Sequence, residues 1–320
     1  MFNKIVAVGH RVVHGGYKLN KPVIINNKII KNIQKSCYFA PIHNPLNIVG
    51  IKSSLFYMPH LYKKNVAVFD TFFHSKLPKI SFLYAIPYKF YKKNNIRKYG
   101  AHGISYSYVL KKSCKFLNKK KKFINLIICH LGNGSSISAI YKGRCIDTSM
   151  GLTPLEGLVM GTRSGDIDPS VIFFLHEKLN ISIKKIKKIL NKKSGMLGLN
   201  EFSNDCRQIT NNYFINKSAK RSIDIFCYRL SKYIASYFAV INSHIDGIVF
   251  TGGIGENSYI IRKLTIQRLS ILNLKINKYK NILCCNNNEG FINKKNTTPI
   301  LVIKTNEELS IALDTAKIIM

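Results

Sequence analysis

Short apolar runs alternate with amphipathic helical patterns along the whole chain, and this alternation limits the folds that the chain can adopt. The runs with the length and composition of buried strands are Ile5–Val8, Val66–Phe69, Leu126–Cys129, Ser136–Ile140, Ile248–Thr251 and Ile300–Ile303. The stretches with helical periodicity are Lys28–Ser36, Ser105–Leu117, Pro169–Leu179, Ser182–Leu190, Ala219–Ile241, Tyr259–Leu269 and Asn306–Ile318. Thr305 precedes Glu308 by three residues, which predicts a capping box at the start of the last helix. The alternation is typical of an α/β architecture.

Segment 147–169 interrupts this pattern. It contains four glycines, two prolines, three aspartates and one arginine, Arg163, but no lysine. So many turn-forming residues exclude a packed helix or strand. We therefore expect a loop that holds a ligand.

The chain is strongly basic, with 50 lysine and arginine residues against 15 aspartate and glutamate residues. Nine of the 50 are arginines, and the lysines come with many isoleucines, asparagines, tyrosines and phenylalanines, all residues of A/T-rich codons. A solvated lysine surface explains the charge, although nucleic acid or an anionic membrane could also bind it. Clusters 119–122 and 181–193 lack the interleaved aromatic residues of a nucleic-acid platform. We expect no specific nucleic-acid or membrane partner.

Length and cysteine spacing indicate the class of protein. A chain of 320 residues favours two domains. No apolar run approaches the ~18 to 20 residues of a membrane span, and the first residues do not resemble a signal peptide. The eight cysteines show no C-x-x-C spacing, which predicts free thiols and no metal–thiolate site. We expect a cytoplasmic protein.

Two glycine-rich islands each follow an expected strand. His130–Ser136 lies between two strands, so its backbone N–H groups could converge on an anion. Thr251–Ser258 follows a strand and opens a helix, where free N–H groups favour a phosphate. Neither island is a Walker A loop, and the second lacks the third glycine of a dinucleotide-binding fingerprint. Together they predict a nucleotide site of another kind.

The chain resembles the acetate kinase family from end to end. The motifs that match, in order, are Gly9–Gly16, Phe69–His74, Tyr99–Gly103, His130–Gly134, the segment 147–169, Gly252–Asn257 and Thr305–Glu308. The resemblance implies the α/β fold of the acetate and sugar kinase, Hsp70 and actin superfamily, with two ribonuclease-H-like lobes and ATP and Mg²⁺ in the cleft. It also implies a homodimeric phosphotransferase that makes acetyl phosphate and ADP from acetate and ATP, reversibly, by direct in-line transfer.

The resemblance also implies roles for individual residues of this chain. The expected catalytic residues are Asp70, His102 and Arg163. The expected substrate-binding residues are Arg11, Val13, Ile42 and Pro154. The expected ATP-binding residues are His130, Leu131, Gly132, Asn133, Gly134, Asp205, Cys206, Arg207, Gly253, Ile254, Gly255, Glu256 and Asn257. Glu307 matches the family's ligand to Mg²⁺ (or Mn²⁺), with a surface glutamate in a first helical turn as the alternative.

Residue chemistry refines two of these roles. The family counterpart of Asp70 is treated as a catalytic acid or base, but acetate is already ionised at neutral pH. We therefore expect Asp70 to orient an arginine or metal-bound water. Ala101 stands where the family commonly has a phenylalanine, so propionate could also enter the methyl pocket. His43 matches a histidine next to the active site, with a core histidine as the alternative.

The sequence departs from the family at its start. The family's Asn-x-Gly-Ser-Ser-Ser-x-Lys loop does not occur here, so we expect an incomplete first lobe (residues 1–72 and 309–320) beside a second lobe (residues 73–308). Two hypotheses follow: an acetate kinase, or a catalytically weak remnant that acts as a binding protein. A short-chain acid kinase that uses propionate is a variant of the first.

Overall fold

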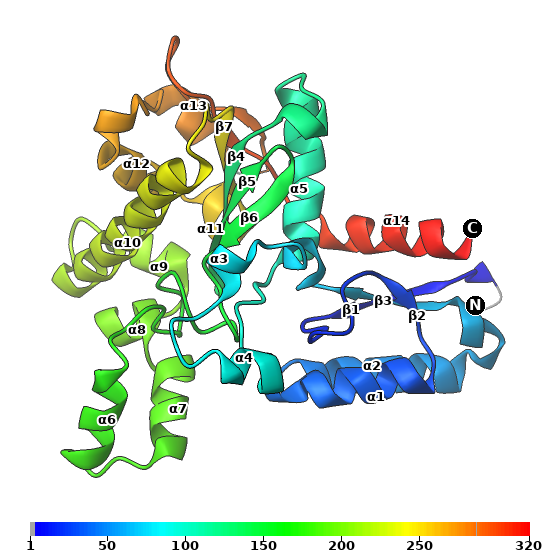
Figure 1. Ribbon diagram of the computed structural model, residues 1–320. Helices are drawn as coiled ribbons and strands as arrows, with labels where there is room; N and C mark the ends of the chain where they lie inside the picture. Colours follow the sequence, from blue (N-terminus) through cyan, green and yellow to red (C-terminus); the bar gives the residue numbers. More distant parts are fainter. Residues whose placement is uncertain (1–3, 286) are drawn as a thin grey trace. The chain divides into compact units, whose positions relative to one another are not determined.

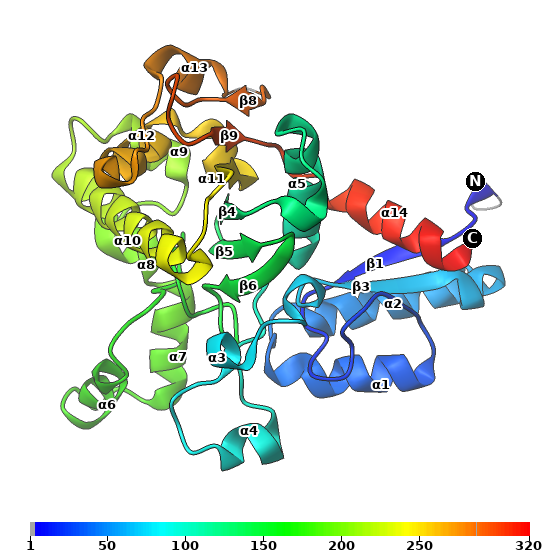
Figure 2. The ribbon, with the colours of Figure 1, turned by 45° about the horizontal axis from the view of Figure 1, so that its top comes forward.

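The computed structural model describes residues 4–285 and 287–320, which fall into two compact units (Figures 1 and 2). The first unit comprises Met1–Lys112, Gly151–Pro154 and Thr305–Met320, and the second comprises Ser113–Met150 and Leu155–Lys304. This partition differs from the expected boundary at residue 72. Residues after 72 pack with the first unit, where the Gly103 N–H donates to the Asp70 carbonyl at 2.8 Å.

A three-stranded sheet with helices on both faces forms the first unit. Its strands are β1 (Val8–Val12), β2 (Val23–Ile24) and β3 (Asn65–Phe69), in the order β1-β3-β2. Its helices are α1 (Asn27–Lys35), α2 (Asn44–Tyr57), α3 (Lys79–Phe82), α4 (Lys89–Asn94), α14 (Glu307–Ile319) and most of α5 (Gly103–Phe116). β1 runs parallel to β3, with Val12 opposite Phe69, so both strands end at the same edge of the sheet.

The central strand β3 is buried along its whole length, because helices cover both faces of the sheet. Ala67 and Phe69 pack in a core with isoleucines of α1 and α2. Val66 and Val68 face the other way and pack against isoleucines of α14. Figure 2 shows α14 and the pair α1 and α2 on opposite sides of the sheet. A continuous apolar run is typical of a parallel strand covered on both sides.

The second unit contains a six-stranded mixed sheet. Its strands are β4 (Leu126–Leu131), β5 (Ser135–Tyr141), β6 (Arg144–Thr148), β7 (Gly247–Thr251), β8 (Gly290–Phe291) and β9 (Ile300–Val302), in the order β6-β5-β4-β7-β9-β8. Its helices are α6 (Ser170–Glu177), α7 (Ile183–Lys192), α8 (Gly195–Asn200), α9 (Cys206–Asn211), α10 (Lys217–Ile241), α11 (Gly252–Asn257), α12 (Tyr259–Gln267) and α13 (Lys278–Leu283). β4, β7 and β9 run parallel, and the hairpin β4–β5–β6 is antiparallel. One large core joins the sheet to α10, the longest helix.

Most expected elements lie within a few residues of their predicted bounds, and two predictions were wrong. The first strand is Val8–Val12 rather than Ile5–Val8, because pairing with β3 selects that register. The last helix is capped by Asn306, whose Oδ1 accepts from the Leu309 N–H at 2.8 Å, and not by Thr305. The Thr305 hydroxyl instead donates to Ser105 Oγ at 2.7 Å.

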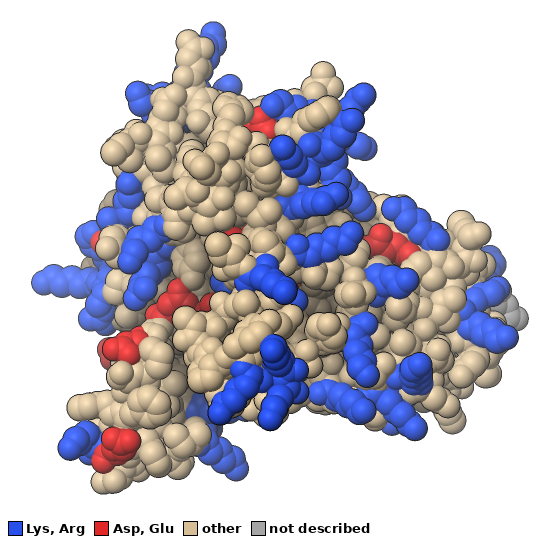
Figure 3. Space-filling view, viewed as in Figure 1, with Lys and Arg blue, Asp and Glu red and all other residues tan. Residues whose placement is uncertain are grey.

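The surface and the cysteines agree with the sequence. Lysines and arginines are spread over many elements of the face shown in Figure 3, and few acidic residues lie between them. On α7, Ile186 and Leu190 are buried while the lysines are exposed, as expected for a surface helix. All eight cysteines lie in the described part of the chain and are free thiols. Within residues 4–285 and 287–320, no helix combines the length and hydropathy that a bilayer crossing requires.

Candidate active site

A cluster of charged side chains lies where β1 and β3 of the first unit end. Arg11 is on β1, and Asp70 directly follows β3, its N–H donating to the Val12 carbonyl at 3.0 Å. Glu307 begins α14, which packs on the same sheet. The carboxyl ends of parallel strands are the usual place for active-site residues in α/β sheets. The structure therefore brings together three residues expected at the site.

Arg11 bridges the two carboxylates. Its Nε and Nη2 donate to Asp70 Oδ2 at 3.2 and 2.8 Å, and its Nη1 lies 2.9 Å from Glu307 Oε2. The Asp70 side chain is only 2% exposed, whereas Arg11 is 42% exposed. Charge-assisted pairs of this geometry hold a guanidinium in one orientation while one edge stays open to a ligand.

Burial and the positive charge of Arg11 shift the pKa values of the two carboxyl groups in opposite directions. Burial raises the pKa of Asp70, and the Arg11 guanidinium opposes that rise. The pKa of Glu307 is raised mainly by burial, while Arg11 lowers it and Asp70 raises it. The carboxylate of Asp70 raises the pKa of Arg11, which therefore stays charged. The three groups form one coupled unit.

The loop after β1 is fixed by buried polar contacts. Asn44 Oδ1 accepts from the His14 N–H at 3.0 Å, and Asn44 Nδ2 donates to the His14 carbonyl at 2.9 Å. The Asn47 side chain accepts from the Val13 N–H at 3.2 Å. Burial lowers the pKa of His14 to about 4, so its ring is neutral. The loop that carries Val13 is thus held rigidly beside Arg11.

The other expected residues of the first unit lie in nearby segments. His43 precedes α2 and acts electrostatically on Asp70, which supports a place near the site rather than in the core. Its neighbour Ile42 is 50% exposed. His102 precedes α5 and has a φ of 57°, a left-handed conformation that is uncommon for residues other than glycine. The segment that carries Pro154 is anchored by the Gly151 carbonyl, which accepts from the Tyr99 N–H at 3.0 Å.

The second unit has a cavity of about 1080 Å³ beside its two glycine islands. Eight of the expected ATP-binding residues line it: Gly132, Asn133, Asp205, Cys206, Arg207, Gly253, Ile254 and Asn257. Other lining residues were not predicted: Asn204, Thr210, Asn211, Phe214, Ser258, Tyr259 and Ile260. Thr210, Asn211 and Phe214 follow the expected segment Asp205–Arg207 within seven residues, and this closeness in sequence was a usable signal.

Five expected ATP-binding residues do not line this cavity: His130, Leu131, Gly134, Gly255 and Glu256. Leu131 is fully buried. Glu256 Oε1 accepts from the Gly252 N–H at 2.8 Å, so this carboxylate organises the loop from within. Each glycine island therefore contains both residues that face the cavity and residues that lie behind them and support the loop.

Glycines allow close contacts around the same cavity. Gly252 has a φ of 77°, and a Cβ there would lie 2.8 Å from the Leu131 carbonyl oxygen. A Cβ on Gly161 would lie 1.8 Å from Asn133 Oδ1. Asn133 in turn accepts from the Gly161 N–H through its carbonyl at 2.9 Å. Gly161, in the loop that follows β6, and Asn133, in the first glycine island, thus contact each other directly within the second unit.

Arg163 lies in this loop and is held by the start of α8. The Met160 N–H donates to the Arg163 carbonyl at 3.2 Å, and the Met196 N–H donates to the Met160 carbonyl at 2.8 Å. Burial lowers the pKa of Arg163. Asp166, also in the loop, accepts from the Gly157 N–H at 2.7 Å and from the Tyr233 hydroxyl at 2.5 Å. The segment after β6 is irregular, as the sequence predicted, and these hydrogen bonds fix its backbone on both sides of Arg163.

The charged cluster fits a hard divalent cation only in part. Within the described ranges, no group of three or more histidine, cysteine, aspartate or glutamate side chains could hold a metal ion. Glu307 uses Oε2 for Arg11, and Asp70 Oδ1 is buried without a hydrogen-bond partner. Mg²⁺ typically takes one or two carboxylates and completes its shell with water and substrate phosphates. Glu307 suits that role.

Comparison with known proteins identifies the family. The model of the Acetokinase family matches residues 1–313. The chain is 57% identical over 319 residues to "Acetate kinase" of Buchnera aphidicola subsp. Acyrthosiphon pisum (strain APS), covering 100% of this chain and 79% of that protein. The chain belongs to the acetokinase family.

Solved structures of acetokinase relatives share the fold. A crystal structure of a propionate kinase from Francisella tularensis subsp. tularensis SCHU S4 superposes with a TM-score of 0.94 at 48% identity, covering 99% of this chain and 80% of that one. Porphyromonas gingivalis acetate kinase superposes with a TM-score of 0.93 at 37% identity, covering 100% and 80%. The expected two-lobed α/β fold of the superfamily is confirmed.

Proposed function

We propose that this chain is a kinase that transfers the γ-phosphoryl group of ATP to acetate, reversibly and in line, giving acetyl phosphate and ADP. The observation that carries the proposal is Arg11 held between Asp70 and Glu307 in a member of the acetokinase family. Phosphoryl transfer requires mainly positioning and cationic stabilisation, and this cluster supplies both.

Arg11 is the proposed carboxylate-binding group. Contacts with Asp70 and Glu307 occupy three of its five N–H donors. One hydrogen on each terminal nitrogen is left for a planar acceptor, and these two suit a carboxylate or a phosphoryl group. Val13, Ile42 and Pro154 are the proposed neighbours of the methyl group.

Asp70 is proposed to orient Arg11 rather than to remove a proton. Its Oδ2 accepts two N–H groups of the guanidinium, and its side chain is sealed from solvent. Acetate, with a carboxyl pKa similar to the ~4.3 of glutamate, arrives ionised and needs no base. The geometry therefore supports positioning as the role of Asp70.

The nucleotide is proposed to bind the glycine-lined cavity of the second unit. N–H groups at the start of α11 and in the turn after β4 suit phosphates. Asp205 and Arg207, paired at 2.7 Å, are proposed neighbours of the nucleoside. Arg163 and His102 are proposed to stabilise charge on the transferred group.

Mg²⁺ (or Mn²⁺) is the proposed cofactor, with Glu307 as its protein ligand. When bound, the ion would neutralise phosphate charge during the transfer. Glu307 would then hold both the ion and Arg11, which would link the metal to the carboxylate-binding group.

The test measures acetyl phosphate formed from ATP and acetate, trapped as the hydroxamate, with and without Mg²⁺. We expect turnover that requires all three components. Arg11→Gln should lower it about 10³-fold, and Lys294→Gln, a surface variant of the second unit, should leave it unchanged. Nucleotide binding without turnover in the unaltered chain would favour the alternative of a binding protein. The absolute rate distinguishes a full enzyme from a weak one.

We also propose a homodimer. Exposed apolar side chains on α6 support it, since Val171, Phe173 and Phe174 are 41%, 58% and 58% exposed. Light scattering of the purified chain should give twice the monomer mass, and Phe173→Glu should shift the chain to the monomer. A monomeric unaltered chain would contradict the proposal.

A further inference from the structure

The first unit has a second cavity, of about 570 Å³, that includes neither Arg11, Asp70 nor Glu307 in its walls. The loop after β1, the segment after β3 and the region around α3 and α4 line it. The proposed phosphotransfer gives this cavity no role. It is large enough for a small organic ligand.

One wall of this cavity carries a buried arginine without an anionic partner. Arg97 is 8% exposed, and its guanidinium carbon lies 3.6 Å from the centroid of the Phe82 ring. Its Nε donates to the Lys98 carbonyl at 3.0 Å, and within residues 4–285 and 287–320 its other nitrogens make no hydrogen bond. Those nitrogens are not among the fully buried atoms that lack a partner, and Arg97 is one of the residues that line the cavity.

A buried guanidinium with one neutral partner is costly unless an anion or solvent satisfies it. Burial accordingly lowers the pKa of Arg97. The ring of Phe82 covers one face of the guanidinium, which leaves its edge for ligands. An edge with two parallel N–H groups matches the oxygens of a phosphate or carboxylate.

The other residues that line the cavity also favour a phosphate ligand. Lys18 and Lys79 are exposed lining residues, and no aspartate or glutamate is among the residues that line the cavity. Three cations favour a doubly charged phosphate over a carboxylate with one charge. Tyr91 and Tyr99 add aromatic surface on which an organic group could pack.

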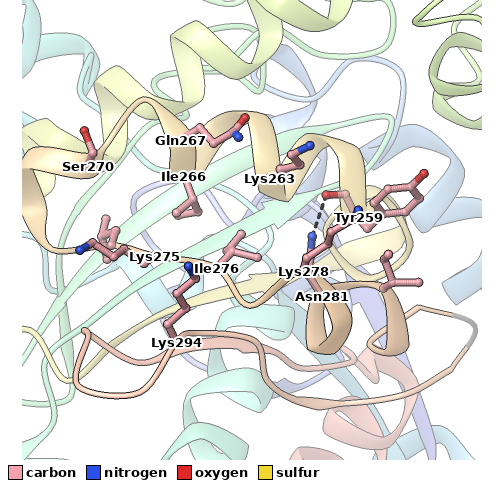
Figure 4. A pocket seen from close by; sticks show the side chains of 12 residues that line it. Tyr259, Lys263, Ile266, Gln267, Ser270, Lys275, Ile276, Lys278, Asn281 and Lys294 are labelled. Carbon is pink, nitrogen blue, oxygen red and sulfur yellow. Dashed lines mark hydrogen bonds between the residues drawn. The ribbon is translucent and has the colours of Figure 1, made fainter.

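The cavity beside α12 and α13 serves as a comparison, because the buried arginine near it finds its acceptors within the protein. Lys263, Lys275, Lys278 and Lys294 line that cavity, which measures about 320 Å³ (Figure 4). All four are exposed. The nearby Arg262 is fully buried, but carbonyls of Gly255, Glu256, Asn281 and Cys284 accept its N–H groups at 2.6–3.0 Å. Each nitrogen of Arg262 thus has a hydrogen-bond acceptor within the protein, whereas the terminal nitrogens of Arg97 have none among residues 4–285 and 287–320.

We propose that the cavity at Arg97 binds the phosphate group of a small organic molecule. Arg97 binds the phosphate oxygens through its open edge. Lys18 and Lys79 contribute charge from the rim, and the tyrosines contact the organic part.

The chain has no tryptophan, so Tyr17→Trp places a single fluorescent reporter on this cavity. Tyr17 is 58% exposed, and the change should leave the fold intact. The reporter protein is titrated with inorganic phosphate, phenyl phosphate and acetate. We expect saturable changes with both phosphates and about tenfold weaker binding of acetate, which has one charge. Tighter binding of phenyl phosphate would assign the site to organic phosphates, whereas tighter binding of inorganic phosphate would overturn that part of the proposal.

Variants in the reporter background test the named residues. Arg97→Gln should weaken phosphate binding about tenfold or more, because it removes charge-assisted hydrogen bonds. Lys79→Gln changes an exposed side chain, should fold normally and should weaken binding about threefold. Lys294→Gln, in the other cavity, and Arg163→Gln, in the second unit, should leave the reporter response unchanged. No saturable response to either phosphate, or a response that survives both Arg97→Gln and Lys79→Gln, would overturn the proposal.

Discussion

The proposed ligand sites of the two units are held in shape by different interactions. In the first unit, buried charges fix one another, with Asp70 2% exposed and Arg11 between two carboxylates. In the second unit, backbone and glycine geometry shape the cavity, and its ion pair, Asp205 with Arg207, is exposed. A charge network should fail when one charge is removed or when pH changes. A glycine-shaped loop should fail when a side chain is added.

The largest effect is expected from Arg11→Gln. The change removes the proposed carboxylate-binding group, so the turnover of acetate should fall about 10³-fold. It also leaves the Asp70 carboxylate buried without its counter-ion, which should lower the free energy of unfolding by about 2 kcal/mol, less than for a fully buried pair. The hydroxamate assay and urea denaturation measure the two effects.

Arg207→Gln is the matched control in the second unit. Its ion pair with Asp205 is exposed, and exposed pairs contribute little. We expect unchanged unfolding and a weaker affinity for ATP. If both variants unfolded at the same urea concentration as the unaltered chain, the contrast between buried and exposed pairs would be wrong.

Acid should destabilise the first unit before the second. Burial lowers the pKa of His14 and of His74 to about 4, so both rings are neutral in the folded state. Between their folded pKa and the unfolded value of 6.5, the unfolded chain binds more protons, so stability is complete above that range and is lost as pH falls. From pH 7.5 to 5 each histidine should cost about 2 kcal/mol.

The pKa values of Asp70 and Glu307 are raised in the folded state, so these groups have the opposite effect on stability. They should favour the folded state as pH falls further. Hydrogen exchange at pH 7.5 and 5, read for peptides of each unit, measures the difference. Protection should fall first in β1 and β3, while β7 and β9, which contain no histidine, serve as the internal control. Equal loss in both sheets would refute the assignment to the two histidines.

A smaller effect is expected from Gly252→Ala. Gly252 has a φ of 77°, and a Cβ would lie 2.8 Å from the Leu131 carbonyl oxygen, so strain should cost about 2 kcal/mol. Binding of ATP should weaken, whereas thermal unfolding of β1 and β3 should not change. The neighbouring Gly253→Ala is the control for stability, because its Cβ meets nothing within 4 Å. A stability loss in Gly253→Ala equal to that in Gly252→Ala would show that the loop is sensitive for another reason.

The fold was predictable from the sequence where packing is continuous. Long apolar runs predicted β4, β7 and α10 within a few residues, because strands and helices of a large core require such patterns. The short edge strand β8 was missed, since two residues carry no periodicity. The helix α2 was missed too: its apolar residues do not concentrate on one face, and only Ile48 and Ile51 are buried apolar residues.

The site was predictable where residue types are rare. Nine arginines among 50 basic residues drew attention to Arg11 and Arg163, and glycine spacing drew attention to the cavity of the second unit. Pairing of Arg11 with Glu307 joins residues from opposite ends of the chain, and no local pattern encodes that contact. The same holds for the unpaired edge of Arg97, which only the packing of Phe82 and Tyr99 defines.

The smallest effect is expected at Ala101, a 4% exposed residue of the first unit with a small side chain. If the small side chain leaves room beside the substrate methyl group, propionate should be used nearly as well as acetate. One methylene in an apolar pocket changes the transition-state energy by only ~1 to 3 kcal/mol, so the ratio of kcat/KM values should stay within about tenfold. Ala101→Val should lower propionate turnover more than acetate turnover by a few-fold, because the added methyls occupy the space of the extra methylene. Thr210→Val, in the cavity of the second unit, changes no residue near the proposed acetate site and should leave the ratio unchanged. An equal loss for both acids in Ala101→Val would mean that this residue supports the fold and does not select the substrate.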